Sequence, residues 1–156
     1  RVSDAEAELA PGITDLALRP SHTPGGALRG QRLGTLRLSH FRPAGARGAP
    51  WVQPSDSLRA RASMRWLSAI PRGAPGPVRC DSLLALRDAC VAGLGQCVLP
   101  TFLGADDPRL VRVRDVEGGT PVWLLSPAVH PGGSPQRRLR LDLSRILRGR
   151  AATWER

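Results

Sequence analysis

The chain contains no lysine and no tyrosine, and its 156 residues include two phenylalanines. All 23 basic residues are therefore arginines, and with 13 acidic residues they give a formal net charge of +10. A surface of this sign attracts phosphate groups. The arginines are spread along the chain, however, and few aromatic side chains are present to stack on bases. Charge without a binding motif gives weak support for direct nucleic-acid binding by this chain.

Three cysteines, Cys80, Cys90 and Cys97, form no C-x-x-C pair, and their neighbours are mostly apolar. This pattern favours buried free thiols in a reducing compartment, so we expect a cytoplasmic protein. No segment approaches the ~18 consecutive apolar residues of a membrane span, and residues 1–12 carry no apolar core of a signal peptide. We expect no membrane partner. Because the sequence has no initiator methionine, we expect a fragment of a longer protein.

The 17 glycines and 15 prolines stand mostly between apolar runs, as in a loop-rich α/β chain. Apolar periodicity predicts helices over residues 4–10, 58–70, 83–91 and 135–147. It predicts strands over residues 13–18, 33–38, 51–53, 77–80, 97–99, 110–113 and 121–125. Short strands that alternate with helices predict βα units and a mainly parallel sheet.

The last helical segment, residues 135–147, combines an apolar stripe with a cluster of basic residues. The stripe consists of Leu139, Leu143, Ile146 and Leu147. The arginines that lie mostly off this stripe are Arg137, Arg138, Arg140 and Arg145. We expect the stripe to face the core and the arginines to form a solvated basic face.

The most informative segment is AGLGQCVLP at residues 92–100, which directly follows the helix-like run DSLLALRDACV. Gly93 and Gly95 end the helix and turn the chain tightly back into the sheet, and Pro100 ends the short strand. In an α/β fold, the carboxyl ends of strands and the amino ends of helices meet at one edge, where ligands bind. Pro100 and the residues after it are therefore expected at such an edge.

The amino end of the helix over residues 83–91 is the strongest candidate for a ligand contact. Its free backbone N–H groups and positive dipole end suit a carboxylate or another anion. Ser82 adds a hydroxyl group. Either Asp81 or Ser82 caps the helix, and for Asp81 we favour the cap over repulsion of an anion. Arg19, expected directly after the strand over residues 13–18, either binds a carboxylate at the same edge or is an ordinary surface arginine.

The order of these elements resembles the effector-binding domain of LysR-type transcriptional regulators, in which a capped helix, an A-G-x-G turn, a short apolar strand and a proline follow one another. Further segments fit in the same order: AELAPGITDLALRP, GQRLGTLRL, DPRLVRV and PVWLLSP, then the C-terminal amphipathic helix. The resemblance covers nearly the whole chain. It implies an α/β, two-lobed periplasmic-binding-protein-like (type 2) fold with mainly parallel sheets, in which lobe 1 comprises about residues 1–42 and 118–150 and lobe 2 about residues 43–117.

The sequence also departs from this family pattern. The winged helix-turn-helix and the linker helix are not found in it, and the first strand and helix of lobe 1 are missing, so we expect an incomplete first lobe. DNA would then be a partner only through the missing N-terminal domain. A homodimer or tetramer is expected for the full-length protein.

By resemblance, the chain is the ligand-sensing regulatory domain of a bacterial regulator. It would bind a small effector, with an anion favoured, between its lobes and so control the DNA-binding transcription factor activity of the whole protein. The implied effector-binding residues are Arg19, Pro20, Asp81, Ser82, Pro100, Thr101 and Phe102. The alternatives are a solute-binding protein of a transport system with the same fold, and a non-functional truncated remnant.

An enzymatic function finds little support in the sequence. The Gly93-Leu94-Gly95 segment ends a helix, whereas a dinucleotide-binding loop starts one, and Ser126 lacks the G-x-S-x-G context of a nucleophile. No metal-ligand spacing links the three histidines, which are expected in loops or at a strand end: His22, His40 and His130. We therefore expect no enzymatic activity, no metal and no cofactor.

Overall fold

The structure is a computed structural model, and it describes residues 8–9, 15–23, 25, 28–71, 76, 78–128 and 135–155. The chain divides into two compact units. Unit 1 comprises Arg1–Leu36 and Thr120–Glu155, and unit 2 comprises Arg37–Gly119 and Arg156. The lobe limits expected from the sequence, near residues 42 and 118, stay a prediction. The helix expected over residues 4–10 lies outside the described residues, apart from Glu8 and Leu9.

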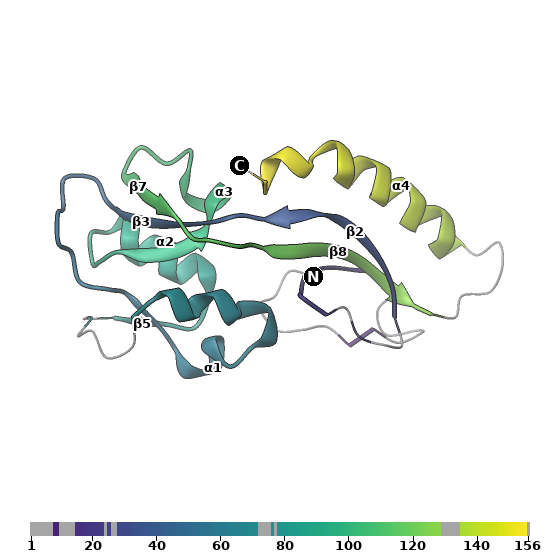
Figure 1. Cartoon of the computed structure of the whole chain (residues 1–156), viewed down its shortest axis with the longest axis horizontal. Helices are drawn as coiled ribbons and strands as arrows, with labels where there is room; N and C mark the ends of the chain where they lie inside the picture. The colour runs from purple at the N-terminus through teal and green to yellow at the C-terminus, as the bar shows by residue number, and fades with distance from the viewer. Residues whose placement is uncertain are drawn as a thin grey trace. The chain divides into compact units, whose positions relative to one another are not determined.

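Unit 1 is built on a three-stranded antiparallel sheet with the order β1-β8-β2. Its elements are β1 (Ala17–Pro20), β2 (Leu28–Leu36), β8 (Thr120–Pro127), α4 (Pro135–Gly149) and the 3₁₀ helix η2 (Ala151–Thr153). Strands β2 and β8 form a long ribbon, and α4 lies along it (Figure 1). The central strand β8 is largely buried, and its side chains supply much of the core of this unit.

The first strand lies further along the chain than the sequence predicted. The strand expected over residues 13–18 is observed as β1, so Asp15 and Leu16 precede it, and Arg19 and Pro20 belong to it. Its end is fixed by long-range bonds, because the indole N–H of Trp123 donates to the carbonyl of Ser21 at 2.9 Å. A proline is tolerated here because β1 is at the edge of the sheet and needs no donor on its outer side.

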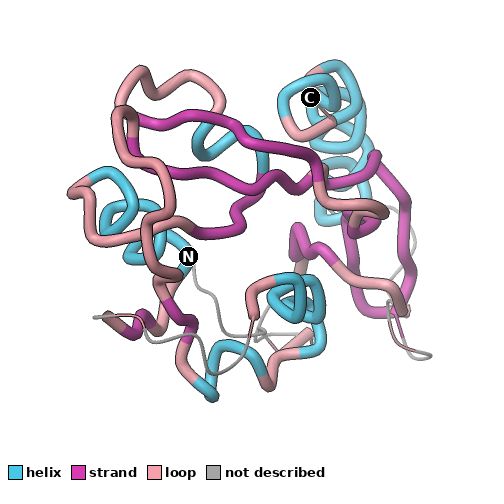
Figure 2. The backbone as a smooth tube through the Cα atoms, turned by 60° about the vertical axis from the view of Figure 1, so that its left-hand side comes forward, coloured by secondary structure: helices cyan, strands magenta, loops and turns pink. Residues whose placement is uncertain are grey.

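The described residues of unit 2 form five strands and four helical segments. They are β3 (Leu38–Pro43), β4 (Gln53–Pro54), α1 (Asp56–Arg59), the 3₁₀ helix η1 (Ala62–Ala69), β5 (Arg79–Cys80), α2 (Leu83–Val91), β6 (Cys97–Pro100), α3 (Thr101–Gly104) and β7 (Leu110–Asp115). Strands and helices alternate along this part of the chain (Figure 2), as the sequence predicted. The short helix α3 was not predicted.

Most strand pairs in the described residues are antiparallel, which corrects the expectation of mainly parallel sheets. Only β4 and β5 form a parallel pair among the described strands, together with the parallel bridge from Trp51 to Gln96. Strands β6 and β7 nevertheless run in the same direction, because both are antiparallel to β3, which lies between them. In unit 1, β8 likewise separates β1 from β2. The periodicity predicts the βα units but not the insertion of a strand from a distant part of the chain.

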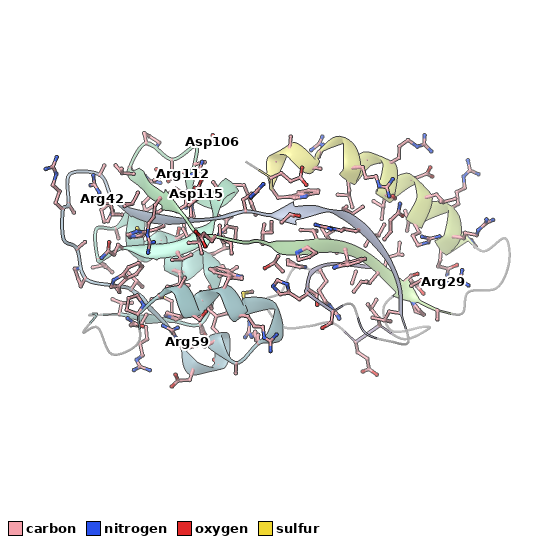
Figure 3. All side chains as sticks on the ribbon, in the orientation of Figure 1. Arg29, Arg42, Arg59, Asp106, Arg112 and Asp115 are labelled. Atoms are coloured by element: carbon pink, nitrogen blue, oxygen red, sulfur yellow. The ribbon has the colours of Figure 1, made fainter. Side chains whose placement is uncertain are left out.

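The helix expected over residues 58–70 is observed as two short pieces, α1 and η1. Ser55 caps α1, since its hydroxyl oxygen accepts from the N–H of Leu58 at 3.2 Å. The guanidinium of Arg59, labelled in Figure 3, donates to the carbonyl of Leu67 and to the Gln53 side-chain oxygen, both at 2.8 Å. These bonds fold η1 back over α1 and break the expected single helix.

The turn between α2 and β6 confirms the importance of the two glycines. Gly93 has a φ of 83°, a left-handed conformation that favours glycine. A Cβ atom on Gly95 would lie 2.4 Å from the carbonyl oxygen of Pro50. That oxygen accepts the N–H of Gln96 at 2.7 Å, so the close approach joins β6 to the chain before β4.

The three cysteines are free and buried, as predicted: Cys80, Cys90 and Cys97. The thiol of Cys90 points at the carbonyl oxygen of Phe41, at 3.8 Å. The hydrogen bond from Cys90 and burial both raise the pKa of Cys97, and burial raises the pKa of Cys80. The thiols of Cys80 and Cys97 are therefore protonated at neutral pH and belong to the core.

The predicted core stripe of the last helix is partly wrong. Leu139 and Ile146 are 51% and 57% exposed, whereas Ser144 is 4% exposed. Leu143 and Leu147 are half-buried. The buried face is thus rotated toward the small Ser144, and a small side chain allows close packing of α4 on its sheet.

Candidate functional site

The candidate site is one edge of the sheet in unit 2. Strands β4 and β5 are in register, with Pro54 opposite Cys80, so both end at the same level. Trp51 and Gln96 form a parallel bridge. If the same register continues for three residues along both chains, Pro54 lies opposite Leu99, one residue before the end of β6. The amino ends of α1, α2 and α3 therefore follow the carboxyl edge of the sheet, where α/β folds bind ligands.

Of the two predicted cap residues, Ser82 and not Asp81 caps α2. The Ser82 hydroxyl oxygen accepts from the N–H of Ala85 at 3.1 Å. The first bond within the helix is donated by the N–H of Leu86 to the Ser82 carbonyl at 3.1 Å. The backbone N–H groups that precede Ala85 therefore have no acceptor within the helix. The Ser82 hydroxyl lies at the same end of α2, and its proton can still donate a hydrogen bond to a ligand. Asp81 is exposed and takes no part in the cap.

The corner between β6 and α3 holds the other three predicted residues of this unit. Pro100 ends β6 and is buried, and Phe102 in the first turn of α3 is 39% exposed. Thr101 is completely buried, and its hydroxyl group is bonded to Ser39 at 2.8 Å. Of these three side chains, that of Phe102 offers the largest surface to a ligand. Direct effector contacts by all three residues stay predictions.

A polar network that starts at the buried side chains of Ser39 and Thr101 was not found from the sequence. Ser39 donates to the carboxylate of Asp115 at 2.9 Å, and Arg112 donates to the same carboxylate (Figure 3). The bonds from Arg112 and Ser39 hold the pKa of Asp115 below its usual value. Thr101 and Asp115 are 62 and 76 residues from Ser39 in sequence, and no local spacing connects them to it. The network fixes the backbone at the amino end of α3.

The remaining two predicted site residues belong to unit 1. Arg19 and Pro20 lie within β1, opposite Trp123 and Val122, so Arg19 does not follow the strand as the sequence suggested. Both side chains are half-buried. Their contribution to effector binding stays a prediction.

His40 is a core residue in the interior of β3, not in a loop or at a strand end as expected. Its Nε2 atom is bonded to the side-chain oxygen of Gln96 at 2.8 Å, and its ring stacks on Trp51 with centroids 4.7 Å apart. Burial lowers the pKa of His40. Among the described residues, no three side chains of the types His, Cys, Asp or Glu are grouped to hold a metal ion.

A concave region lies beside α3 and has a volume of about 490 Å³. Its lining consists of Arg87, Phe102, Leu103, Asp106, Asp107, Pro108 and Arg109. Arg87 and Arg109 both donate to the carboxylate of Asp107, at 2.7 and 2.8 Å. These two guanidinium groups are therefore already paired, and the cavity is less suited to an anion than the helix end at Ser82.

The paired carboxylate predicts a stability loss in acid. The bonds from Arg109 and the nearby Arg87 lower the pKa of Asp107 from 3.8 to about 2. Because the folded-state pKa is the lower one, the stabilisation is complete above the unfolded value and is lost as the pH falls through about 2. Thermal melts at pH values between 3.8 and about 2 should show that Tm falls more steeply with decreasing pH for the wild type than for Asp107→Asn. Parallel curves would contradict the pairing.

No helix among the described residues combines the length and the apolar character that a bilayer crossing requires.

The comparison with curated proteins found no match. Solved regulatory domains are similar in fold. The effector domain of AmpR from Pseudomonas aeruginosa matches with a TM-score of 0.67 and 15% identity, over 96% of this chain and 80% of that one. The CrgA regulatory domain from Neisseria meningitidis, a LysR-type transcriptional regulator, has a TM-score of 0.65 and 17% identity, over 88% and 75%.

The regulatory domain of AphB from Vibrio vulnificus has a TM-score of 0.61 and 18% identity, over 90% of this chain and 79% of that one. These neighbours confirm the periplasmic-binding-protein-like type 2 fold. The sequence itself matches the family described as LysR substrate binding domain over residues 2–148. The chain therefore belongs to the LysR substrate binding domain family.

Proposed function

We propose that the chain is the ligand-sensing domain of a bacterial, cytoplasmic LysR-type transcriptional regulator, and that it binds a small anionic effector. The observation that carries this proposal is the family match over residues 2–148. In the whole regulator, effector binding changes promoter occupancy through a separate DNA-binding domain. A homodimer or tetramer is the expected assembly of that protein.

The effector class follows from the groups at the sheet edge of unit 2. The amino end of α2 supplies backbone N–H groups and the Ser82 hydroxyl, all of which donate to an anion. Phe102, in the first turn of α3, offers an exposed apolar surface. The carboxylate of Asp115 is already bound by Arg112 and Ser39, so it does not compete for these donors. A small carboxylate with an apolar body is the ligand that fits this set.

A panel of carboxylates and a variant that removes the exposed negative charge of Asp81 together test the charge of the effector. Thermal shift measurements on the 156-residue chain with a panel of small mono- and dicarboxylates should identify ligands that raise Tm. A ligand at about 100 times its Kd stabilises the fold by roughly 2.7 kcal/mol. Asp81→Asn removes a negative charge beside α2 and should tighten binding several-fold.

Asp88→Asn is the matched control, because it removes the same charge from the other end of α2. Its affinity for the panel ligand should equal that of the wild type. Equal gains in both variants would show a general charge effect and remove the helix end from the site. A panel without any stabilising carboxylate would contradict the anionic effector.

A further inference from the structure

The solvent side of α4 carries four exposed arginines, Arg137, Arg138, Arg145 and Arg148, which we call the α4 basic face. At 100° per residue they fall within a sector of roughly 100° around the helix axis. The first and last of them are about 16 Å apart along the axis. Several nitrogen-tipped side chains extend outward from α4 in Figure 3. The four guanidinium groups thus form one continuous surface.

In the part of the chain that the structure describes, one of the four arginines has a carboxylate partner. Asp142 pairs with Arg145 at 2.9 Å. No carboxylate partner is recorded for Arg137, Arg138 or Arg148 among the described residues. Two of these arginines lie near the amino end of α4, where the helix dipole disfavours a positive charge. An anionic partner would relieve this repulsion.

The basic face is also not required for packing. The four side chains are exposed, whereas Ser144, which is buried where α4 packs on β2, lies just outside their sector, about 20° beyond Arg137. Within the sector of the four arginines, Leu141 is the one apolar residue. A single leucine is too little apolar surface for insertion into a bilayer. The sector contains no aromatic side chain, so it offers nothing on which a base can stack.

We propose that the α4 basic face binds the phosphate backbone of double-stranded DNA without reading its sequence. A row of about 16 Å spans several phosphates of one strand. The planar guanidinium group binds phosphate oxygens in pairs, which suits a contact to the backbone. The choice of DNA over an acidic protein rests on the proposed regulator function, which places the chain near a promoter. The contact would add affinity and leave sequence recognition to other parts of the regulator.

Fluorescence anisotropy of two labelled duplexes of unrelated sequence, titrated with the 156-residue chain without effector, tests this proposal. Both duplexes should bind equally, and binding should weaken steeply between about 50 and 200 mM salt. Each phosphate contact contributes about 0.9 to the slope of log K against log salt. The triple variant Arg137→Gln, Arg138→Gln, Arg148→Gln should therefore lower the slope by about 2 to 3.

The matched control is Arg47→Gln, Arg65→Gln, Arg114→Gln, which removes the same charge from three exposed arginines of unit 2. Circular dichroism should first establish that both triple variants are folded. The control should keep the wild-type slope. Equal losses in both variants, or no DNA binding by the wild type at low salt, would overturn the proposal.

Two further probes separate DNA from other anionic partners. Poly-L-glutamate and phosphatidylserine vesicles should compete weakly, with no dependence on the α4 arginines. Tighter binding of either probe, lost in the α4 variant, would assign the surface to an acidic protein or a membrane and overturn the DNA contact. Effector binding is measured separately, so its failure would leave the DNA result intact and would count against the proposed function alone.

Discussion

Replacing Gly95 by alanine is expected to destabilise unit 2 by about 1–3 kcal/mol, the usual cost of overpacking. The new Cβ atom would lie 2.4 Å from the carbonyl oxygen of Pro50 and 3.1 Å from a methyl carbon of Val52. The first neighbour is a backbone atom and cannot rotate away. Because the same oxygen accepts the N–H of Gln96, relief of the clash would break the bond that attaches β6. Urea denaturation of the chain measures the loss.

Gly93 is the control position for Gly95. A substitution at Gly93 is limited by the backbone φ angle, whereas the surroundings leave room for a side chain. Gly93 has a φ of 83°, and no atom lies within 4 Å of an added Cβ. Asparagine adopts this left-handed conformation more readily than other residues. Gly93→Asn should therefore cost less than about 1 kcal/mol, while Gly95→Asn should cost at least as much as Gly95→Ala. Similar losses for the two asparagine variants would mean that the contact with Pro50 does not limit position 95.

The sequence predicted the parts of unit 2 whose signals are adjacent in the chain. Helix α2, the glycine turn and β6 were found because a cap, an apolar period, two glycines and a proline follow one another within residues 82–100. The cap itself was left open between Asp81 and Ser82, since the two residues have nearly equal preference for the position. Only the geometry of the Ser82 hydroxyl distinguishes them.

Features that depend on distant partners were not predictable in the same way. The position of β1 is set by its register with β8, more than one hundred residues later, and the sequence placed Arg19 outside the strand for this reason. The bond between Ser39 and Asp115 likewise joins residues that no motif connects. On α4, the apolar stripe suggested burial of Ile146, but close packing on β2 favoured the smaller Ser144. Local patterns therefore predict elements, whereas tertiary contacts decide which face each element buries.

Ser82, at the sheet edge of unit 2, has two roles that can be separated, namely capping α2 and donating to an effector. Its oxygen accepts the N–H of Ala85 and so stabilises the start of α2. Its proton is the group that would donate to an anionic effector. Loss of the cap usually costs about 1 kcal/mol of folding stability. Loss of a hydrogen bond to a charged ligand costs about 1–3 kcal/mol of binding free energy.

Ser82→Ala is therefore expected to lower both Tm and the affinity for the carboxylate identified in the thermal shift panel, the latter by about 1–3 kcal/mol. Ser82→Gly separates the two roles, because glycine at a cap position costs only a few tenths of a kcal/mol in stability. The glycine variant should keep a nearly native Tm and bind the carboxylate as weakly as the alanine variant. Calorimetry supplies the affinities. Wild-type affinity in Ser82→Gly would show that the hydroxyl caps the helix and does not touch the effector, and the ligand would then have to be placed elsewhere.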